Sequence, residues 1–500
     1  MKRYTLLVAV LALLAVSCMK DKGSYDYTAV NRVQIKGIDS SYNVDLGARL
    51  IIRPTLTMTD DPIGDTANYS YKWVVDHAIG FGAVGFIIST QHDLDTAVAG
   101  LRLSAGSYSM YYRVTDKKTG IFTDSHFLLT MTTASYEGWL LLCDTEDGNS
   151  RLDMISHAGN HDTLYRNILQ KMQSTYVATG KPAYVATGIA NVGGPAIGFV
   201  TTFVATSKKA VVLGANALDY FPPSYDMNTM MYISDPFTDW SNAKLYLSNL
   251  CGMLYANRNL YNVEAFSING PVNTRDGGTA LFTPSAWVGI DKQQAFGDPM
   301  IVFDSTSGTF LRYPGLGSTC LTLPAGDLFN FSTGMELLYM TYVPFSGGQV
   351  FAVLKDRRSE KRYLACFTLT GKQNYYAEIS GEGISAATQF AVSPDLGYLF
   401  YDVGGKVYEY DPVLKQALLM HDYGASTISL MKFQPFASIF DLALNAEYYK
   451  SLEKKLLVCT YTKGVGMLDL YTVPEINGQI QLYRSYPGTG KVVSLAYRER

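Results

Sequence analysis

The sequence predicts an all-β protein in which a small β-sandwich is followed by a β-propeller of about seven blades. Its composition gives the first indication, because 37 Tyr and 44 Gly stand beside only 4 Trp. Tyrosine suits half-buried sheet surfaces and glycine suits tight turns. The second indication is a series of short alternating runs before residue 134, and the third is a set of recurring strand-rich groups after it. A chain of 500 residues is also too long for one simple core, so at least two domains are expected.

The expected sandwich spans residues 32–133. Its candidate strands are residues 32–36, 48–57, 69–75, 85–89, 107–115 and 125–132. In the fifth run, Tyr108, Met110, Tyr112 and Val114 recur at every second position, which places them on one face of a strand. So many short strands within roughly 100 residues are typical of an antiparallel sandwich.

The expected propeller spans residues 134–500. Strand-rich groups recur there about every 45–55 residues, and no long amphipathic helix separates them. The plainest hairpins are residues 138–155, 198–213 and 389–410, each built around a turn signal. We expect residues 491–496 to pair with a strand near Gly138 and close the ring. Residues 157–182 are expected to form a helical insertion.

The N-terminus has the features of an export signal. Lys2 and Arg3 precede an uncharged apolar run at residues 4–16, which is shorter than the roughly 20 residues of a membrane span. Ala15-Val16-Ser17-Cys18 resembles the lipobox of bacterial lipoproteins. The resemblance implies removal of residues 1–17 and a lipid on Cys18. The polar residues 18–31 are expected to be a tether.

Several function classes have little support. Lys and Arg are scattered and the net charge is -3, so no nucleic-acid partner is expected. The sequence contains no linear signature of a hydrolase nucleophile, a zinc protease or a nucleotide site. We therefore assign no catalytic residue, no metal ligand and no cofactor. The five cysteines after Cys18 form no C-x-x-C pair, and we expect them to pack as small apolar side chains.

Two polar groups have spacings that partly suit a metal site. His157 and His161 have a spacing that suits one helical face, but Gly159-Asn160 lies between them, so solvated loop histidines are favoured. The acids of residues 144–147 partly resemble a calcium loop, but Asp147-Gly148 is itself a hairpin signal. A turn is therefore expected there.

Ligand binding is the favoured function class. An aromatic stretch at residues 220–240 offers rigid rings with polar tips, which suit sugars or peptide side chains. Its candidate binding residues are Tyr220, Phe221, Tyr225, Tyr232 and Trp240. The alternative is that these rings fill the core between blades.

A second candidate binding site consists of Tyr255 and Arg258, where the guanidinium group suits a carboxylate. An ordinary hairpin tip would contain the same residues.

Two resemblances extend this interpretation. Tyr69-Ser70-Tyr71-Lys72-Trp73, together with residues 106–116, resembles the polycystic-kidney-disease (PKD) type of immunoglobulin-like domain. With the lipobox, the tether and the opening Tyr136-Glu137-Gly138-Trp139-Leu140, the chain resembles the PKD-like family lipoproteins of Bacteroidota.

The second resemblance implies an outer-membrane, surface-exposed accessory protein of a SusC/SusD-type, TonB-dependent importer. It would bind an oligopeptide or an oligosaccharide without catalysis. The alternative is a surface-anchored propeller-fold glycoside hydrolase or lyase, whose two acids would come from different blades.

Overall fold

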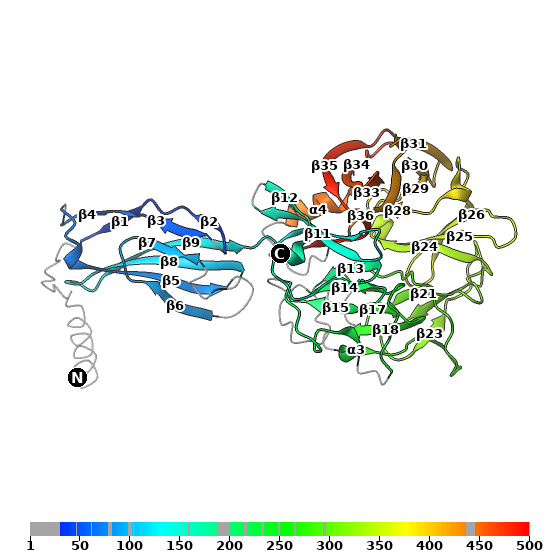
Figure 1. Ribbon diagram of the computed structural model, residues 1–500, viewed down its shortest axis with the longest axis horizontal. Helices are drawn as coiled ribbons and strands as arrows, with labels where there is room; N and C mark the ends of the chain where they lie inside the picture. The colour runs from blue at the N-terminus through cyan, green and yellow to red at the C-terminus, as the bar shows by residue number, and fades with distance from the viewer. Residues whose placement is uncertain are drawn as a thin grey trace, which may run out of the picture. The chain divides into compact units, whose positions relative to one another are not determined.

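The structure, a computed structural model, describes residues 31–499 except 47, 62, 79–82, 99–102, 104, 159–160, 189–200, 215–217, 232–234, 249–250, 265–266, 294–296 and 437–445. The chain divides into two compact units, Met1–Met131 and Thr132–Arg500. Strands dominate both units, which confirms the all-β class (Figure 1). The predicted signal, the tether and Cys18 lie outside the described residues. Within the described part, no helix is long and apolar enough to cross a bilayer.

The first unit is a β-sandwich, as predicted. Its strands are β1 (Val33–Lys36), β2 (Ser41–Asp45), β3 (Arg49–Ile52), β4 (Thr55–Met58), β5 (Tyr69–Ala78), β6 (Ala83–Ser89), β7 (Leu94–Ala97), β8 (Gly106–Asp116) and β9 (Phe122–Thr132). A five-stranded sheet has the order β2-β9-β8-β5-β6, and β1-β4 and β3-β7 form two-stranded sheets. Trp73 and Tyr112 of the large sheet share one core with Leu50 and Leu94 of the small β3-β7 sheet. The two sets of sheets therefore bury one common layer of side chains.

The predicted run at residues 48–57 is split into β3 and β4. Pro54 lies between the two strands, and proline has no backbone N–H to donate to a sheet. The two halves pair with different partners, β3 with β7 and β4 with β1. Strands β2 and β7 were not expected, because both are short and carry few large apolar residues.

The second unit contains seven sheets within its described residues, which confirms a propeller of about seven blades (Figure 1). Blade 1 holds β10 (Gly138–Asp144), β11 (Ser150–Ala158), β12 (His161–Tyr165) and β36 (Lys491–Arg498); blade 2 holds β13 (Pro182–Gly188), β14 (Thr201–Thr206) and β15 (Ala210–Leu213); blade 3 holds β16 (Lys244–Leu247), β17 (Cys251–Ala256), β18 (Asn259–Glu264) and β19 (Ser267–Asn269).

Blade 4 holds β20 (Thr274–Arg275), β21 (Met300–Asp304), β22 (Thr309–Tyr313) and β23 (Thr319–Thr322); blade 5 holds β24 (Glu336–Val343), β25 (Gln349–Lys355), β26 (Arg362–Phe367) and β27 (Gln373–Glu378). Blade 6 holds β28 (Phe390–Val392), β29 (Leu399–Val403), β30 (Lys406–Asp411) and β31 (Gln416–Asp422); blade 7 holds β32 (Thr427–Lys432), β33 (Lys455–Thr462), β34 (Val465–Thr472) and β35 (Gln481–Thr489). The described α-helices are short: α2 (Ile168–Lys171), α3 (Met227–Met230) and α4 (Ala446–Glu453).

One strand of each blade lies innermost in the ring. These strands are β36, β13, β16, β24, β28 and β32, and in blade 4 a segment at residues 284–289 takes this place by bridging to β21. Neighbouring inner strands contact one another, so side chains that point inward from different blades meet near the ring axis.

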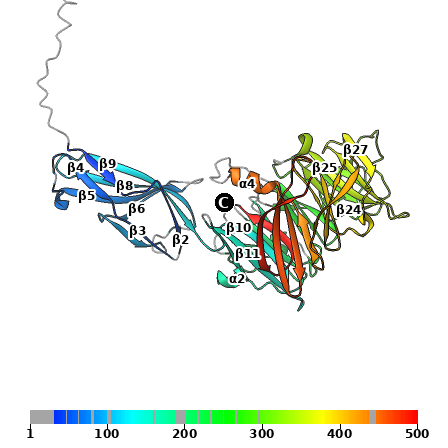
Figure 2. The same ribbon diagram turned by 90° about the horizontal axis from the view of Figure 1, so that it is seen from above.

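The C-terminal strand closes the ring, as predicted. β36 runs antiparallel to β10, with Leu140 opposite Ala496 and Leu142 opposite Ser494. Figure 2 shows the red C-terminal strand beside β10. β36 also contacts β13 on one side and β32 on the other, so it links the first blades to the last. Closure leaves blade 1 with four strands although only three come from its own part of the sequence.

Residues 137–139, at the start of the propeller, contact residues near its C-terminal end. The buried carboxylate of Glu137 accepts hydrogen bonds from the hydroxyls of Tyr497 (2.8 Å) and Tyr449 (3.0 Å). Trp139 packs edge-on against Tyr497, with 4.7 Å between the ring centroids. Gly138 has φ +134°, and a Cβ there would lie 2.1 Å from the carbonyl oxygen of Ile155. Only glycine fits this position without displacing β11.

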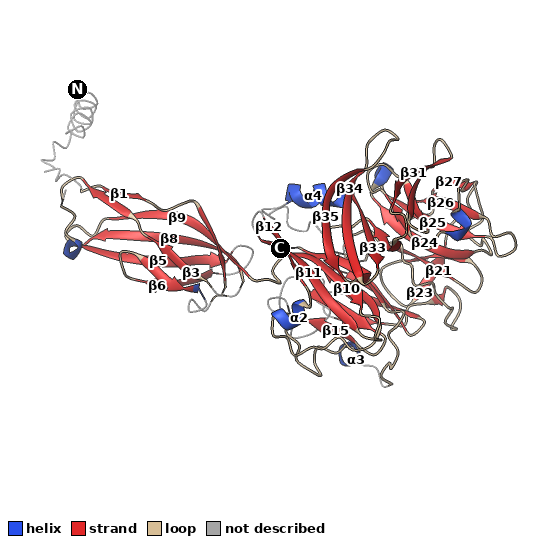
Figure 3. Cartoon of the chain, turned by 45° about the horizontal axis from the view of Figure 1, so that its top comes forward, coloured by secondary structure: helices blue, strands red, loops and turns tan. Residues whose placement is uncertain are grey.

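The helical insertion expected at residues 157–182 is wrong. The segment contains the hairpin strand β12 and the one-turn helix α2 (Figure 3), and it ends at the first residue of β13. His157 and His161 are likewise strand residues and not loop residues. His157 lies opposite Asp162, with 2.6 Å between Nδ1 and Oδ1. Cross-strand pairing and packing outweigh the helical spacing of the few apolar residues.

Asp162 is satisfied by protein groups. Besides His157, it accepts hydrogen bonds from Arg484 (2.5 Å) and Tyr486 (2.6 Å) of β35. These bonds connect β12 of blade 1 with β35 of blade 7. Among the residues that the structure describes, no group of three His, Cys, Asp or Glu side chains is arranged to hold a metal ion.

Gly138→Ala is expected to destabilise the propeller by about 2–4 kcal/mol, because the added Cβ meets the backbone of β11 and the positive φ is strained. Urea unfolding followed by tryptophan fluorescence measures the change. Gly278→Ala is the matched control, since the nearest atom to its Cβ lies 3.4 Å away and its φ is ordinary. Equal stability of the two variants would contradict the account of residues 137–139.

Candidate functional site

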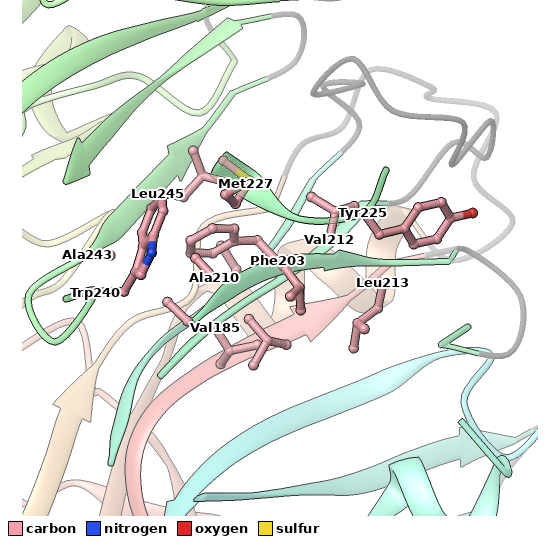
Figure 4. Close-up of a cluster of buried hydrophobic side chains, with 14 of the residues drawn as sticks. Val185, Phe203, Ala210, Val212, Leu213, Tyr225, Met227, Trp240, Ala243 and Leu245 are labelled. Atoms are coloured by element: carbon pink, nitrogen blue, oxygen red, sulfur yellow. The ribbon is translucent and has the colours of Figure 1, made fainter. Parts of the chain in front are cut away.

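The aromatic stretch at residues 220–240 is largely core. Tyr220, Tyr225 and Trp240 are only 8%, 6% and 2% exposed, whereas Phe221 is 58% exposed. Trp240 packs in the hydrophobic cluster that joins blades 2 and 3, and Tyr225 lies at the edge of the same cluster (Figure 4). Tyr232 lies outside the described residues. Three of the four described candidate residues thus fill the space between blades, which is the alternative that the sequence left open, and only Phe221 among those four is exposed.

Tyr220 is held by its own polar network. Its hydroxyl donates to Asp226 (2.6 Å) and accepts from Lys209, which also pairs with Asp226 at 2.9 Å. A ligand would have to break this network to reach the hydroxyl.

The second predicted pair, Tyr255 and Arg258, belongs to the β17–β18 hairpin. Tyr255 is buried against blade 4. Arg258 is exposed beside Asn257, and both have positive φ, of 62° and 46°. Two central residues with positive φ are the mark of a tight hairpin turn. Arg258 therefore occupies the hairpin tip and does not join Tyr255 in one site.

The inner strands bring together a set of rings that the sequence did not single out. Tyr184 of β13 and Tyr246 of β16 lie 6.3 Å apart by ring centroids, and Trp287 of blade 4 lies 5.0 Å from Tyr339 of β24. The Nζ of Lys244 stands 3.3 Å from the centroid of the Trp287 ring. We call these five residues the axial cluster. Each is half-buried, so each keeps surface that water reaches although it lies among the inner strands.

Burial controls the chemistry of the axial cluster. Desolvation lowers the pKa of Lys244 to about 8 and raises the pKa of Tyr184 to about 12. Desolvation and the neighbouring Tyr184 and Tyr339 hydroxyls raise the pKa of Tyr246. At neutral pH the tyrosines are therefore neutral hydrogen-bonding groups. The Lys244 ammonium is stabilised by the face of Trp287 through a cation–π contact.

A site of this composition can bind a ligand through its rings. Rings from four blades supply flat, rigid surfaces for stacking a sugar or an apolar peptide side chain. The hydroxyl of Tyr246 is fixed by donation to the carbonyl of Ala286 (2.9 Å), which orients its ring. Such fixed rings lose little conformational freedom when a ligand binds.

Two lysines lie at the C-terminal ends of inner strands, and we call them the lysine pair. Lys432 ends β32, and its Nζ donates to the carbonyl of Leu495 at 3.0 Å. Lys292 follows the inner segment of blade 4, and its Nζ lies 3.5 Å from the carbonyl oxygen of Thr187. Desolvation lowers the pKa of both, and repulsion from Lys292 helps to bring that of Lys432 to about 8.

The axial cluster escaped prediction because its members are far apart in the sequence, with about one ring per blade. The signal available was a Tyr or Trp on the first strand of successive groups, as in Tyr184, Tyr246 and Tyr339. Which side of a strand faces the axis depends on the register between blades, and that register is set by tertiary packing.

The PKD-like family model matches residues 18–182, which cover the sandwich and strands β10, β11 and β12 of blade 1 but less than half of the chain. No curated protein matches the sequence. Among solved structures, a quinonprotein alcohol dehydrogenase-like protein from Bacteroides thetaiotaomicron is 12% identical, covers 93% of this chain and 99% of its own, and has a TM-score of 0.37.

Two further structures are similar to parts of the chain. A lignostilbene dioxygenase from Pseudomonas brassicacearum is 7% identical over 73% of this chain and 93% of its own, with a TM-score of 0.38. A human PKD domain is 18% identical over 22% of this chain and 90% of its own, with a TM-score of 0.17. These likenesses are too distant to carry any activity over to this chain.

Lys432→Met is expected to stabilise the protein at pH 7 by about 1–3 kcal/mol, because it removes a desolvated ammonium group. Below pH 8 the folded and unfolded chains both hold the Lys432 proton. Between pH 8 and about 10.4 only the unfolded chain holds it, so wild-type stability rises relative to the variant. Urea unfolding at intervals from pH 7 to 10 measures both curves.

The groups that act on Lys432 are Lys292 and the Cys459 thiol. The buried thiol stays protonated over this range because desolvation raises its pKa. A constant stability difference between wild type and Lys432→Met from pH 7 to 10 would show that Lys432 does not titrate there.

Proposed function

We propose that this chain is a lipid-anchored protein of the outer-membrane surface that binds an oligopeptide or an oligosaccharide at the axial cluster, as a non-catalytic accessory component of a SusC/SusD-type importer. The observation that carries the binding function is the convergence of Tyr184, Tyr246, Trp287 and Tyr339 from four blades, all half-buried.

The axial cluster supports binding better than the residues singled out from sequence. Tyr220, Tyr225 and Trp240 already pack against protein, so exposing them to a ligand would cost core contacts. The axial rings keep water-accessible surface, and covering it with a ligand releases that water favourably. Lys244 adds a hydrogen-bond donor beside the stacked rings.

Anchoring and export are supported by the N-terminal residues. The apolar run ends in Ala15-Val16-Ser17-Cys18, and the match to the PKD-like family begins at residue 18. In this proposal Cys18 carries the lipid, and the sandwich separates the propeller from the membrane. Association with an importer rests on the resemblance to PKD-like lipoproteins and has its own test below.

Trp287→Ala is expected to weaken ligand binding about tenfold or more, since stacking on one ring contributes about 1–2 kcal/mol. Calorimetric titration of the purified protein with the tightest-binding member of a peptide and glycan mixture measures the loss. Phe221→Ala is the matched comparison, because Phe221 is the exposed ring of the sequence-predicted stretch.

A larger loss in Phe221→Ala than in Trp287→Ala would move the binding site from the axis to residues 220–240. Analysis of the same mixtures for new products tests the alternative function. Cleaved peptide or glycan would favour a hydrolase or a lyase over a binding protein.

Cys18→Ala is expected to release the protein from membranes while leaving its urea unfolding midpoint unchanged, because the lipid is a tether and no part of either core. Fractionation of cells followed by immunoblotting measures the release. Wild-type protein purified from detergent-solubilised membranes is expected to bring down a TonB-dependent barrel, identified by mass spectrometry. Membrane retention of Cys18→Ala would contradict the anchor, and absence of a barrel would contradict the importer role.

A further inference from the structure

The lysine pair sits where inner strands from opposite sides of the ring meet. Lys292 belongs to blade 4 and reaches the carbonyl of Thr187 in blade 2. Lys432 belongs to blade 7 and donates to the carbonyl of Leu495 in blade 1. Blades 4 and 2 are not neighbours, so the contact with Thr187 places the Lys292 ammonium group near the ring axis. Lys432 ends the inner strand β32, which contacts the inner strand β36 of the neighbouring blade 1.

Two further hydrogen bonds connect blades at the same end. The amide of Gln293 donates to the carbonyl of Phe436 at 2.9 Å and so links blade 4 to blade 7. The hydroxyl of Thr187 donates to the carbonyl of Tyr497 and links blade 2 to blade 1. These bonds connect the inner strands around the lysine pair. The positions of the two ammonium groups are therefore restricted.

Within the part of the chain that the structure describes, the lysine pair has no carboxylate partner at contact distance. Among the described residues, no carboxylate oxygen lies within 4.0 Å of either Nζ. Glu453 and Glu499 act on Lys292 from farther away, and burial raises the pKa of Glu453 to about 7, which weakens its negative charge at neutral pH. Repulsion from Lys292 helps to lower the pKa of Lys432, and an anion close to both ammonium groups would relieve that repulsion.

The alternative interpretation is that each lysine only connects two blades through its hydrogen bond. Such a structural role needs a hydrogen-bond donor for a backbone carbonyl and needs no charge. A buried serine or glutamine would supply that donor without the desolvation cost of an ammonium group. Charged groups that are costly to bury and lie in a site are more often functional.

We propose that the lysine pair binds a carboxylate group of the ligand whose body lies on the axial cluster. This inference rests on the proposed function, because it names the chemical class of the ligand at the same axis. Along β13, Tyr184 and Thr187 are three residues apart, which is about 10 Å. A ligand of three to four peptide or sugar units spans such a distance, with its rings or side chains at the axial cluster and its acid at the lysine pair.

The test uses matched acid and neutral probes. Acetyl-trialanine is compared with its C-terminal amide, and trigalacturonate with its methyl ester, by calorimetric titration of the purified protein at low salt. In at least one of the two pairs, the acid is expected to bind at least tenfold more tightly than its neutral partner. Inorganic phosphate in the same titrations shows whether a free oxyanion competes for the lysine pair.

Lys292→Met and Lys432→Met are each expected to abolish the preference for the acid while the neutral probe binds as before. Lys361→Met is the control, because Lys361 is an exposed lysine just before β26 of blade 5 and is paired with Glu378 of β27 (2.8 Å). Lys432→Arg keeps the charge and is expected to keep most of the preference. Urea unfolding of each variant establishes that it is folded before titration.

Three results would overturn the inference: equal binding of acid and neutral probes by the wild type, a preference that survives in both methionine variants, or no binding of either acid probe. If the acid and neutral probes bind equally and both lose affinity in Trp287→Ala, the axial cluster binds ligands but the lysine pair does not recognise a carboxylate. Preference for the acid that is lost in the methionine variants but not in Trp287→Ala would place the ligand on the lysine pair alone.

Discussion

The pairing of β36 with β10 is the interaction on which the rest of the propeller depends. A ring of sheets is stable only when its last blade meets its first, and here the chain supplies the innermost strand of blade 1 from its C-terminus. The buried carboxylate of Asp153 reinforces the junction. It binds the Arg151 guanidinium at 2.6 and 2.8 Å and accepts from the backbone N–H of Asn167 (2.9 Å) and of Gly490 (3.3 Å). Hydrophobic packing and charged hydrogen bonds thus act on the same few strands.

Closure of the ring also determines which side chains lie at its axis. Because the six inner strands and the inner segment of blade 4 are held in one ring, residues more than 100 positions apart in the sequence become neighbours, as Lys292 and Thr187 are. Tyr184, Tyr246, Trp287 and Tyr339 cannot form a site on separate blades, since each blade contributes a single ring. Burying Lys244, Lys292 and Lys432 there costs desolvation free energy. The surrounding core offsets this cost, because it buries large apolar side chains between every pair of neighbouring blades. Charged residues that are kept at partly buried positions, where they lower stability, are typical of a functional site.

Much of the fold could be predicted from local patterns, and most of the site could not. Asp147-Gly148 and the run after Pro394 are turn signals between alternating strands, and both hairpins are present. The closing strand was predictable because a propeller with a free edge is unstable. Tyr220 and Trp240 were misleading, since an aromatic residue suits a core and a binding surface equally well, and only packing decides between them. The axial cluster depends on registers between blades that no local pattern encodes.

Hydrogen–deuterium exchange of the backbone amides tests most directly whether closure by β36 holds the ring together. If it does, the amides of β10 and β36 exchange as slowly as those of the inner strands β13 and β16, because all of them become exposed only when the ring opens as a whole. The contradicting result is rapid exchange in β36 while β13 and β16 remain protected. In that case the ring persists without its closing strand, and the axial cluster is held by the other blades alone.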